Sequence, residues 1–202
     1  MGKYIERTFD LSADSRQPEY NGSYDHLVEV SMNEFAVTNT NASKPVLATY
    51  GLSPCVSLVG YSPEDKVGFL THYYGCTDMG NSFGLLLYHI LKQLGKNPSD
   101  FSSDPTNFEV RLIGGYNGMS ESLINSIRGR FHTRSDISMK LVEEDTLAGE
   151  GSKSVALDTR DGSLYSYNPM LNPQRRELGE LEKRLLTSGL SSTAKLAYSP
   201  KN

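Results

Sequence analysis

The 202-residue sequence contains only two cysteines and four histidines, and it has no tryptophan. Two cysteines in a chain of this length do not make a disulfide framework, and no other feature points to an oxidising compartment. We therefore expect thiols, with a Cys55–Cys76 disulfide as the alternative. Cys76 also follows His72 by four positions, but no second ligand pair accompanies them. A zinc site is therefore not indicated, and we expect no metal and no cofactor.

Strong charge and long apolar runs are also lacking. The formal net charge is −4, which gives no electrostatic reason to bind nucleic acid or an acidic membrane surface. No apolar run reaches the roughly 20 residues that span a bilayer, and residues 1–16 lack the apolar segment of a secretory signal peptide. We expect a cytoplasmic protein without membrane insertion; a secreted effector without a classical signal peptide is the alternative.

Segments with strand and helix patterns follow one another in mixed order, which predicts a single α+β domain. β-Branched and apolar runs bounded by turn residues predict strands at 27–31, 34–38, 45–50, 56–61, 67–71, 108–113, 138–143, 152–158 and 163–167. Apolar residues at helical spacing predict helices at 83–94, 120–131 and 175–187, the first with a cap at Asn81–Ser82.

This pattern divides the chain into three parts. Residues 1–26 form an N-terminal extension that either lies over the domain or is a partly mobile arm. Residues 27–170 form the main domain, and residues 171–202 form a C-terminal helix and tail, frayed from residue 188 onward.

The residues whose side chains are best suited to catalysis are Cys55, His72 and Thr49. Two strand-like runs flank the turn-rich segment 62–65, which is typical of a hairpin. A cysteine that opens the first strand can then face a histidine that closes the second. A thiol beside an imidazole can form a thiolate–imidazolium pair, the activated nucleophile of cysteine hydrolases. The hydroxyl of Thr49 could orient the imidazole through its other ring nitrogen.

Each of these residues also has an ordinary structural interpretation. A lone cysteine is most often a small buried apolar residue, a lone histidine is usually structural, and a threonine is favoured in strands by its β-branching. The catalytic interpretation of each residue therefore depends on that of the other two. Cys76 is expected to be structural. Gly114–Gly115 is expected to allow a bend or a close backbone approach, because it lacks the spacing of a phosphate-binding loop.

The turn at residues 49–55 reads Thr-Tyr-Gly-Leu-Ser-Pro-Cys, and His72 closes the following strand. This arrangement resembles the T-x-G-L-G-S-C turn and histidine of the chemoreceptor glutamine deamidase (CheD) family. The similarity extends over residues 28–168, including an Arg-Leu-Ile-Gly-Gly strand end at 111–115 and a closing hairpin at 144–167. The same fold is shared with toxins of the cytotoxic necrotizing factor type, which deamidate glutamines of host proteins.

The resemblance implies a β-sandwich-like core of mixed sheets flanked by helices, in α/β/β/α layers. It implies a cysteine-dependent hydrolase that deamidates glutamine side chains of a protein, without a cofactor. Cys55 would be the nucleophile, His72 the base and Thr49 the residue that holds the imidazole. The protein substrate would be a chemoreceptor in chemotaxis, or a host protein if the chain is a toxin-like effector.

Two departures from the family pattern favour a second hypothesis, a non-catalytic interaction protein on the same fold. Pro54 stands where the family has serine and removes one backbone N–H beside the nucleophile. An Ile-Gly-x-Arg-Asn motif after the glycine pair is not evident, and Asn125 is the residue that could replace its asparagine. A third hypothesis, a thiol-redox module, ranks lower because the sequence has no Cys-x-x-Cys motif.

Overall fold

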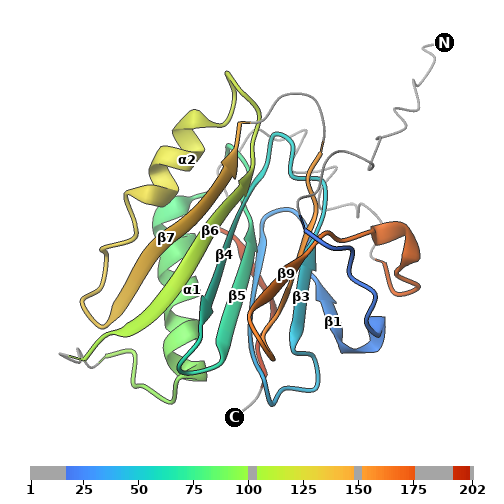
Figure 1. Ribbon diagram of the computed structural model, residues 1–202. Coiled ribbons are helices and arrows are strands. Elements are labelled where there is room, and N and C mark those ends of the chain that lie inside the picture. The colour runs from blue at the N-terminus through green and yellow to red at the C-terminus, as the bar shows by residue number, and fades with distance from the viewer. Residues whose placement is uncertain (1–16, 100–103, 148–151, 176–192, 201–202) are drawn as a thin grey trace.

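Two β-sheets packed face to face form the centre of the computed structural model (Figure 1), which describes residues 17–99, 104–147, 152–175 and 193–200. The larger sheet has the strand order β10 (Lys195–Tyr198), β2 (Glu34–Asn39), β5 (Val67–His72), β4 (Val56–Ser62), β6 (Thr106–Gly114) and β7 (Ile137–Thr146). The smaller sheet has the order β1 (Leu27–Glu29), β3 (Val46–Thr49), β8 (Val155–Asp158) and β9 (Ser163–Tyr165). Both sheets are mixed, because β10–β2, β6–β7 and β1–β3 pair in parallel and the other neighbours pair antiparallel.

Two α-helices, α1 (Met79–Gln93) and α2 (Glu121–Arg128), lie on the face of the six-stranded sheet that points away from the smaller sheet (Figure 1). Short 3-10 turns occur at Tyr24–His26 and Pro169–Leu171. The α+β fold with a β-sandwich-like core flanked by helices is therefore confirmed. Both α-helices of the described residues lie on one face, so these residues form α/β/β layers rather than the α/β/β/α layers that the resemblance implied. The expected helix at 175–187 falls mostly on residues 176–192, which lie outside the described residues.

Covering both faces of the six-stranded sheet explains why its central strands β4 and β5 are buried along their whole length. Alternate residues of a strand point to opposite faces, so two separate apolar layers form. The layer toward the helices contains Val56, Leu58, Phe69 and Tyr73 with the apolar stripe of α1. The layer between the sheets contains Cys55, Val59, Tyr61, Leu70 and Tyr74 with Leu47, Val155 and Leu157 of the smaller sheet.

The described part of the N-terminal extension lies over the domain. Tyr20 is buried against the outer face of the smaller sheet, where its ring meets that of Tyr165 edge-on at 5.8 Å between centroids. Its hydroxyl donates to the Ser23 carbonyl oxygen at 3.1 Å. Residues 17–26 thus follow the alternative in which the extension lies over the domain.

The C-terminal segment differs from the sequence-based expectation. Residues 195–198 were expected to be frayed, and this is wrong because they form β10, an outer strand of the six-stranded sheet. The Lys195 N–H donates to the Asn33 carbonyl oxygen at 2.9 Å, and the Ala194 N–H donates to Ser82 Oγ at 2.8 Å. Ser82 is therefore a buried contact of this segment rather than the cap of α1.

Helix α1 begins at Met79, four residues earlier than the expected start at Phe83. Its N-cap is Asp78, whose side chain accepts from the Asn81 N–H at 3.2 Å. Aspartate satisfies a free N–H of the first helical turn and favours the positive end of the helix dipole. The predicted cap at Asn81–Ser82 is therefore wrong, while the buried stripe predicted by the helical spacing is present.

Gly114 and Gly115 let β6 end directly against the loop that carries Cys55. Their φ angles are 98° and 87°, a region that favours glycine. A Cβ atom on Gly114 would lie 2.6 Å from Leu52 Cβ and 2.7 Å from the Cys55 carbonyl oxygen. The expectation of a bend with close backbone approach is confirmed.

We expect Gly114→Ala to lower the free energy of unfolding by about 2–4 kcal/mol, because it adds backbone strain and a steric clash. Urea unfolding followed by far-UV circular dichroism measures this. Gly84→Ala is the matched control, since Gly84 is a helical position with no neighbouring atom within 4 Å of an added Cβ. It should raise stability by about 0.5–1 kcal/mol. Equal effects of the two substitutions would contradict the close approach at Gly114.

Candidate active site

Thr49 and His72 face each other across the space between the two sheets. Thr49 is the last residue of β3 and His72 is the last residue of β5. The distance between Thr49 Oγ1 and His72 Nδ1 is 2.8 Å, and both residues are buried. The structure therefore brings together two of the three residues that the sequence singled out.

A second hydrogen bond decides which ring nitrogen of His72 carries the proton. The Thr49 hydroxyl donates to the Val30 carbonyl oxygen at 2.7 Å. A hydroxyl has only one proton, so Thr49 Oγ1 accepts from His72 rather than donating to it. Nδ1 is therefore the protonated nitrogen, and Nε2 is left with its lone pair, as a general base requires.

Burial keeps this imidazole neutral. The side chain of His72 is 4% exposed, and desolvation of the charged form lowers its pKa from 6.5 to about 4. The Val30 carbonyl offsets part of this shift. At neutral pH the ring is thus available as a proton acceptor. The burial of His72 favours a neutral imidazole at rest over the imidazolium of the ion pair that the sequence suggested.

Cys55 lies on the same face as His72, immediately before β4. Val56 and Tyr73 exchange two backbone hydrogen bonds of 2.9 Å, which fixes the register of the strands at this end. Cys55 is therefore diagonal to His72 and, like His72, is directed into the space between the sheets. Cys55 is 6% exposed, and Nε2 of His72 has no hydrogen-bond partner among the described residues. Cys55 thus lies on the same sheet face as His72, and its thiol makes no hydrogen bond to Nε2.

The loop before Cys55 is held by three other parts of the chain. The Leu52 N–H donates to the Lys153 carbonyl oxygen at 3.1 Å, ahead of β8. The Ser120 hydroxyl, at the start of α2, donates to the Pro54 carbonyl oxygen at 2.7 Å. The Gly115 N–H donates to the Cys55 carbonyl oxygen at 2.8 Å. These contacts fix the backbone on both sides of the Cys55 Cα, and the Ser53–Pro54 peptide bond within the loop is cis.

The sequence-based reasoning missed Val30 and Ser120. Val30 acts through its backbone carbonyl, so no side-chain pattern could have indicated it. Ser120 was recognised only as the start of a helix, although a serine at such a position is a potential hydrogen-bond donor to a neighbouring loop. Asn125 is exposed on α2 and its carboxamide oxygen accepts from Arg128 at 3.2 Å. The structure therefore does not bring it to the buried Thr49–His72 pair.

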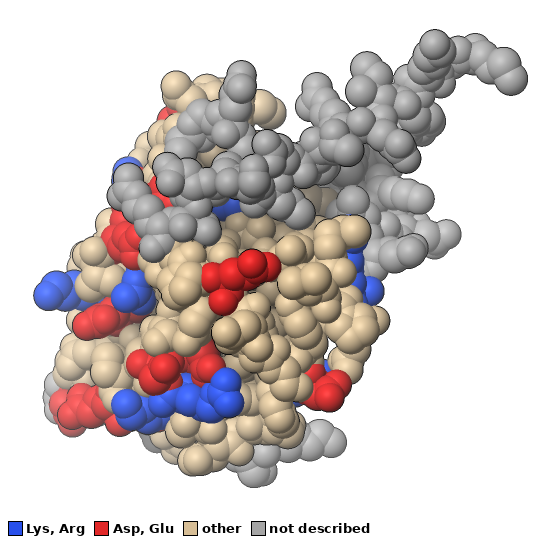
Figure 2. Space-filling model, turned by 45° about the vertical axis from the view of Figure 1, so that its right-hand side comes forward, with Lys and Arg blue, Asp and Glu red and all other residues tan. Residues whose placement is uncertain are grey.

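Neither cysteine forms a disulfide, so the expected thiol forms are present. Within the described ranges, no group of three or more histidine, cysteine, aspartate and glutamate side chains is arranged to hold a metal ion. In the same part of the chain, no helix has the length and apolar character to cross a membrane. Lys and Arg side chains are interspersed with Asp and Glu side chains on the face shown in Figure 2, and neither sign forms a continuous patch there.

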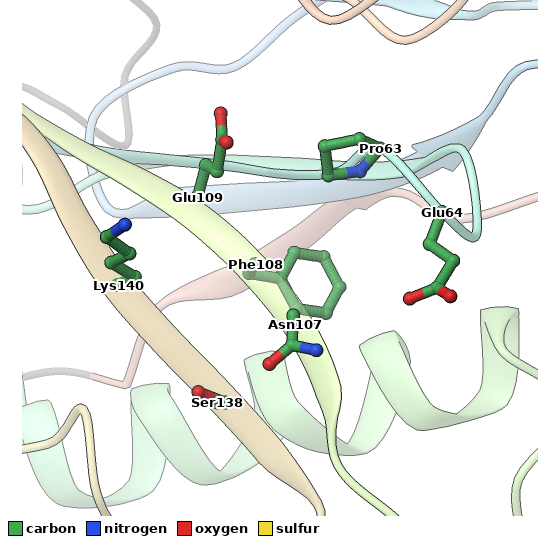
Figure 3. A pocket seen from close by; sticks show the side chains of 7 residues that line it. All are labelled: Pro63, Glu64, Asn107, Phe108, Glu109, Ser138 and Lys140. Carbon is green, nitrogen blue, oxygen red and sulfur yellow. The ribbon is translucent and has the colours of Figure 1, made fainter.

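A hollow of about 360 Å³ lies at the other end of the six-stranded sheet (Figure 3). It is lined by Pro63, Glu64, Asn107, Phe108, Glu109, Ser138 and Lys140. Val56 pairs with Gly114 near Cys55, whereas Tyr61 pairs with Glu109 beside the hollow. Tyr61 is five positions along β4 from Val56, a distance of about 17 Å at the usual rise per residue. This hollow is therefore separate from the Thr49–His72 pair.

No protein-family model matches the chain. The uncharacterized protein R721 of Acanthamoeba polyphaga mimivirus is 29% identical over 149 residues, which correspond to 64% of this chain and 53% of the relative. The chain thus spans about half the length of the curated relative that it matches.

The buried imidazole predicts a specific dependence of stability on pH. Below about pH 6.5 the unfolded chain binds a proton at residue 72 that the folded protein does not bind until about pH 4. Stability should therefore fall as the pH decreases through this window, by about 3 kcal/mol from this residue alone. Urea unfolding between pH 7.5 and 4.5 should show a smaller loss for His72→Gln than for the wild type.

His89→Gln is the control for this experiment. The pKa of His89 is lowered by partial burial and by Lys92, so its contribution has the same sign. Because its side chain is less buried than His72, the substitution should remove a smaller part of the pH dependence. Parallel curves for His72→Gln and the wild type would contradict the neutral buried imidazole.

Proposed function

We propose that the protein is a cysteine-dependent amidohydrolase that deamidates glutamine side chains of a protein substrate. The supporting observation is the hydrogen bond from His72 Nδ1 to Thr49, which leaves the Nε2 lone pair on the face that carries Cys55. The resemblance of residues 28–168 to chemoreceptor glutamine deamidases supports the choice of substrate. The Ser120 and Gly115 contacts support a fixed position for the nucleophile.

In the proposed reaction, His72 Nε2 accepts the thiol proton as Cys55 Sγ attacks the carbon of the glutamine carboxamide. The carbonyl oxygen gains the negative charge, and backbone N–H groups around Cys55 stabilise it. The C–N bond breaks, the nitrogen takes the proton from Nε2, and ammonia leaves. Water then hydrolyses the thioester to glutamate and the free thiol. Thr49 keeps Nε2 directed at the reacting atoms throughout.

The surface beside the loop that carries Cys55 suits a polypeptide substrate. The segment from Gly115 to Ser120 is joined to this loop by the Ser120–Pro54 hydrogen bond. Tyr116 and Met119, on this segment, are 42% and 66% exposed. Exposed aromatic and methionine side chains are enriched in protein interfaces. The partner is a chemoreceptor-like protein in the cytoplasm, or a host protein if the chain acts as an effector.

A second candidate function is a non-catalytic interaction protein on the same fold. Two observations favour it: Cys55 is 6% exposed, and the His72 Nε2 atom makes no hydrogen bond to the thiol. In this alternative, Thr49 and His72 serve only to join the two sheets. The two functions differ in the reactivity of Cys55.

Thiol alkylation distinguishes these functions. If His72 acts as a base for Cys55, iodoacetamide should modify Cys55 faster than Cys76 at pH 7, although Cys76 is the more exposed thiol. His72→Ala should slow the modification of Cys55 by about tenfold or more and leave Cys76 unchanged. Peptide mass spectrometry of the native protein gives both rates in one sample. Faster modification of the more exposed Cys76, with a Cys55 rate unaffected by His72→Ala, would favour the interaction protein.

The activity itself is tested with receptor cytoplasmic domains and then with a whole-cell lysate. We expect a specific glutamine to become glutamate, with release of ammonia. Cys55→Ser should abolish turnover without loss of the fold, because a serine hydroxyl is far less ionised than a thiol at neutral pH. Free glutamine should be a poor substrate, since contacts with the surrounding protein contribute binding energy at the reacting centre.

Thr49 variants provide a matched pair for this assay. Thr49→Ser keeps the hydroxyl that bonds His72 and Val30, so most of the activity should remain. Thr49→Val keeps the shape but removes both hydrogen bonds, and we expect a rate reduction of about 10–100-fold. No conversion of glutamine in either substrate set, by folded protein with a reactive Cys55, would exclude glutamine deamidation.

A further inference from the structure

A second polar atom without a partner lies on the face of β4 that carries Cys55. Ser57 is fully buried, and its Oγ has no hydrogen-bond partner among the described residues. His72 Nε2 is another such atom at the same end of the sheet, whereas Tyr61 Oη, which also lacks a partner among the described residues, lies toward the opposite end of β4. Buried polar atoms without a partner are rare and require an explanation.

The strand register places these two atoms on facing residues. Val56 pairs with Tyr73 and Val59 pairs with Leu70, so Ser57 lies opposite His72. Because Val56 and Tyr73 exchange both backbone hydrogen bonds, the next pair is of the non-hydrogen-bonded type, in which side chains are closest. Ser57 and His72 therefore point side by side into the space between the sheets.

The ladder of backbone pairs is interrupted at this position. Its regular pairing stops at Val59 and resumes only at Val56. Between them, the Leu58 N–H donates to the Thr71 hydroxyl at 2.9 Å. A side chain thus takes the place of a direct strand-to-strand contact beside Ser57 and His72. The backbone pairing is thus irregular where the two polar atoms lie.

The stability of the folded protein does not explain a serine at position 57. The residues around it in β4 are apolar, including Val56, Leu58 and Val59. A hydroxyl that loses its hydrogen bonds to water on folding lowers stability, and alanine would fill nearly the same volume without that loss. The hydroxyl therefore needs a partner that is not among the described residues.

We propose that Ser57 Oγ and His72 Nε2 bind one water molecule between them, and that this water hydrolyses the thioester on Cys55. The hydrolytic role of this water rests on the proposed function. Buried waters typically make about three hydrogen bonds to otherwise unsatisfied groups. The Ser57 hydroxyl and the Nε2 lone pair supply two of them, and the thioester is the remaining neighbour. Cys55 is two residues before Ser57 on the same strand face, so the three side chains converge.

The hydrolytic step balances with these residues alone. The water oxygen bonds to the thioester carbon while Nε2 takes one water proton, with the Ser57 oxygen holding the other. The C–S bond then breaks, and the Cys55 sulfur recovers the proton from Nε2. The products are a carboxylic acid and the original thiol. During the preceding step, the same position receives the leaving ammonia before water replaces it.

A high-resolution crystal structure of the wild-type protein tests the binding position. We expect a water within about 2.7–3.2 Å of both Ser57 Oγ and His72 Nε2. A direct hydrogen bond between Ser57 and Nε2, or a dry contact between them, would overturn the proposal. This result does not depend on the identity of the substrate.

The hydrolytic role is tested with p-nitrophenyl acetate, which acetylates reactive thiols. Intact-protein mass spectrometry follows the formation and loss of acetyl-Cys55. Ser57→Ala should leave acetylation unchanged and slow deacetylation by about tenfold, the effect of one lost hydrogen bond in the transition state. Ser57→Thr should recover most of the rate. Added methylamine, which does not need the bound water, should intercept a larger fraction of the acetyl-enzyme in Ser57→Ala than in the wild type.

Tyr73→Phe is the matched control. Its hydroxyl is also buried without a hydrogen-bond partner among the described residues, but Tyr73 faces the helices. Removing it should leave both acetylation and deacetylation unchanged. Equal deacetylation in the wild type and Ser57→Ala would overturn the hydrolytic role while leaving the proposed function intact. Absence of any acetyl-Cys55 in the wild type would overturn both.

Discussion

The hydrogen-bonded chain from His72 through Thr49 to the Val30 carbonyl is the interaction on which the candidate site depends. It crosses from the six-stranded sheet to the smaller one, so the orientation of the imidazole depends on how the two sheets pack. Since the Thr49 proton is used on the Val30 backbone, the tautomer of His72 follows from the fold rather than from a charged neighbour. A hydroxyl in this role keeps the imidazole neutral, whereas a carboxylate would raise its pKa.

The position of Cys55 has a different origin, in backbone rather than side-chain contacts. The close approach of Gly114 and the Ser120–Pro54 hydrogen bond fix the loop from the side of β6 and α2. The orientation of the imidazole is thus fixed from the smaller sheet, and the loop of Cys55 is fixed from the end of the larger one. Because Cys55 and His72 lie on neighbouring strands of the same sheet, relative movement of the two sheets would turn the imidazole ring without changing the register between these residues.

The sequence predicted the parts of this arrangement that depend on local patterns. Strand periodicity and the turn at 62–65 predicted the hairpin of β4 and β5, and therefore the shared face of Cys55 and His72. It could not predict contacts made by backbone atoms, such as the Val30 carbonyl, or a strand such as β10 whose partner lies about 160 residues away. The start of α1 was misplaced because Asp78, Asn81 and Ser82 are all residues that cap helices well.

The pairing of β10 with β2 has a consequence during synthesis of the protein. Strand β2 pairs with β5 on one side and with β10 on the other, and β10 is formed by residues 195–198. During synthesis, β2 therefore stays an open sheet edge, with unpaired N–H and C=O groups, until residues 195–198 have left the ribosome. Such an edge can pair with other chains. The nascent protein is consequently exposed to aggregation through β2 until β10 emerges.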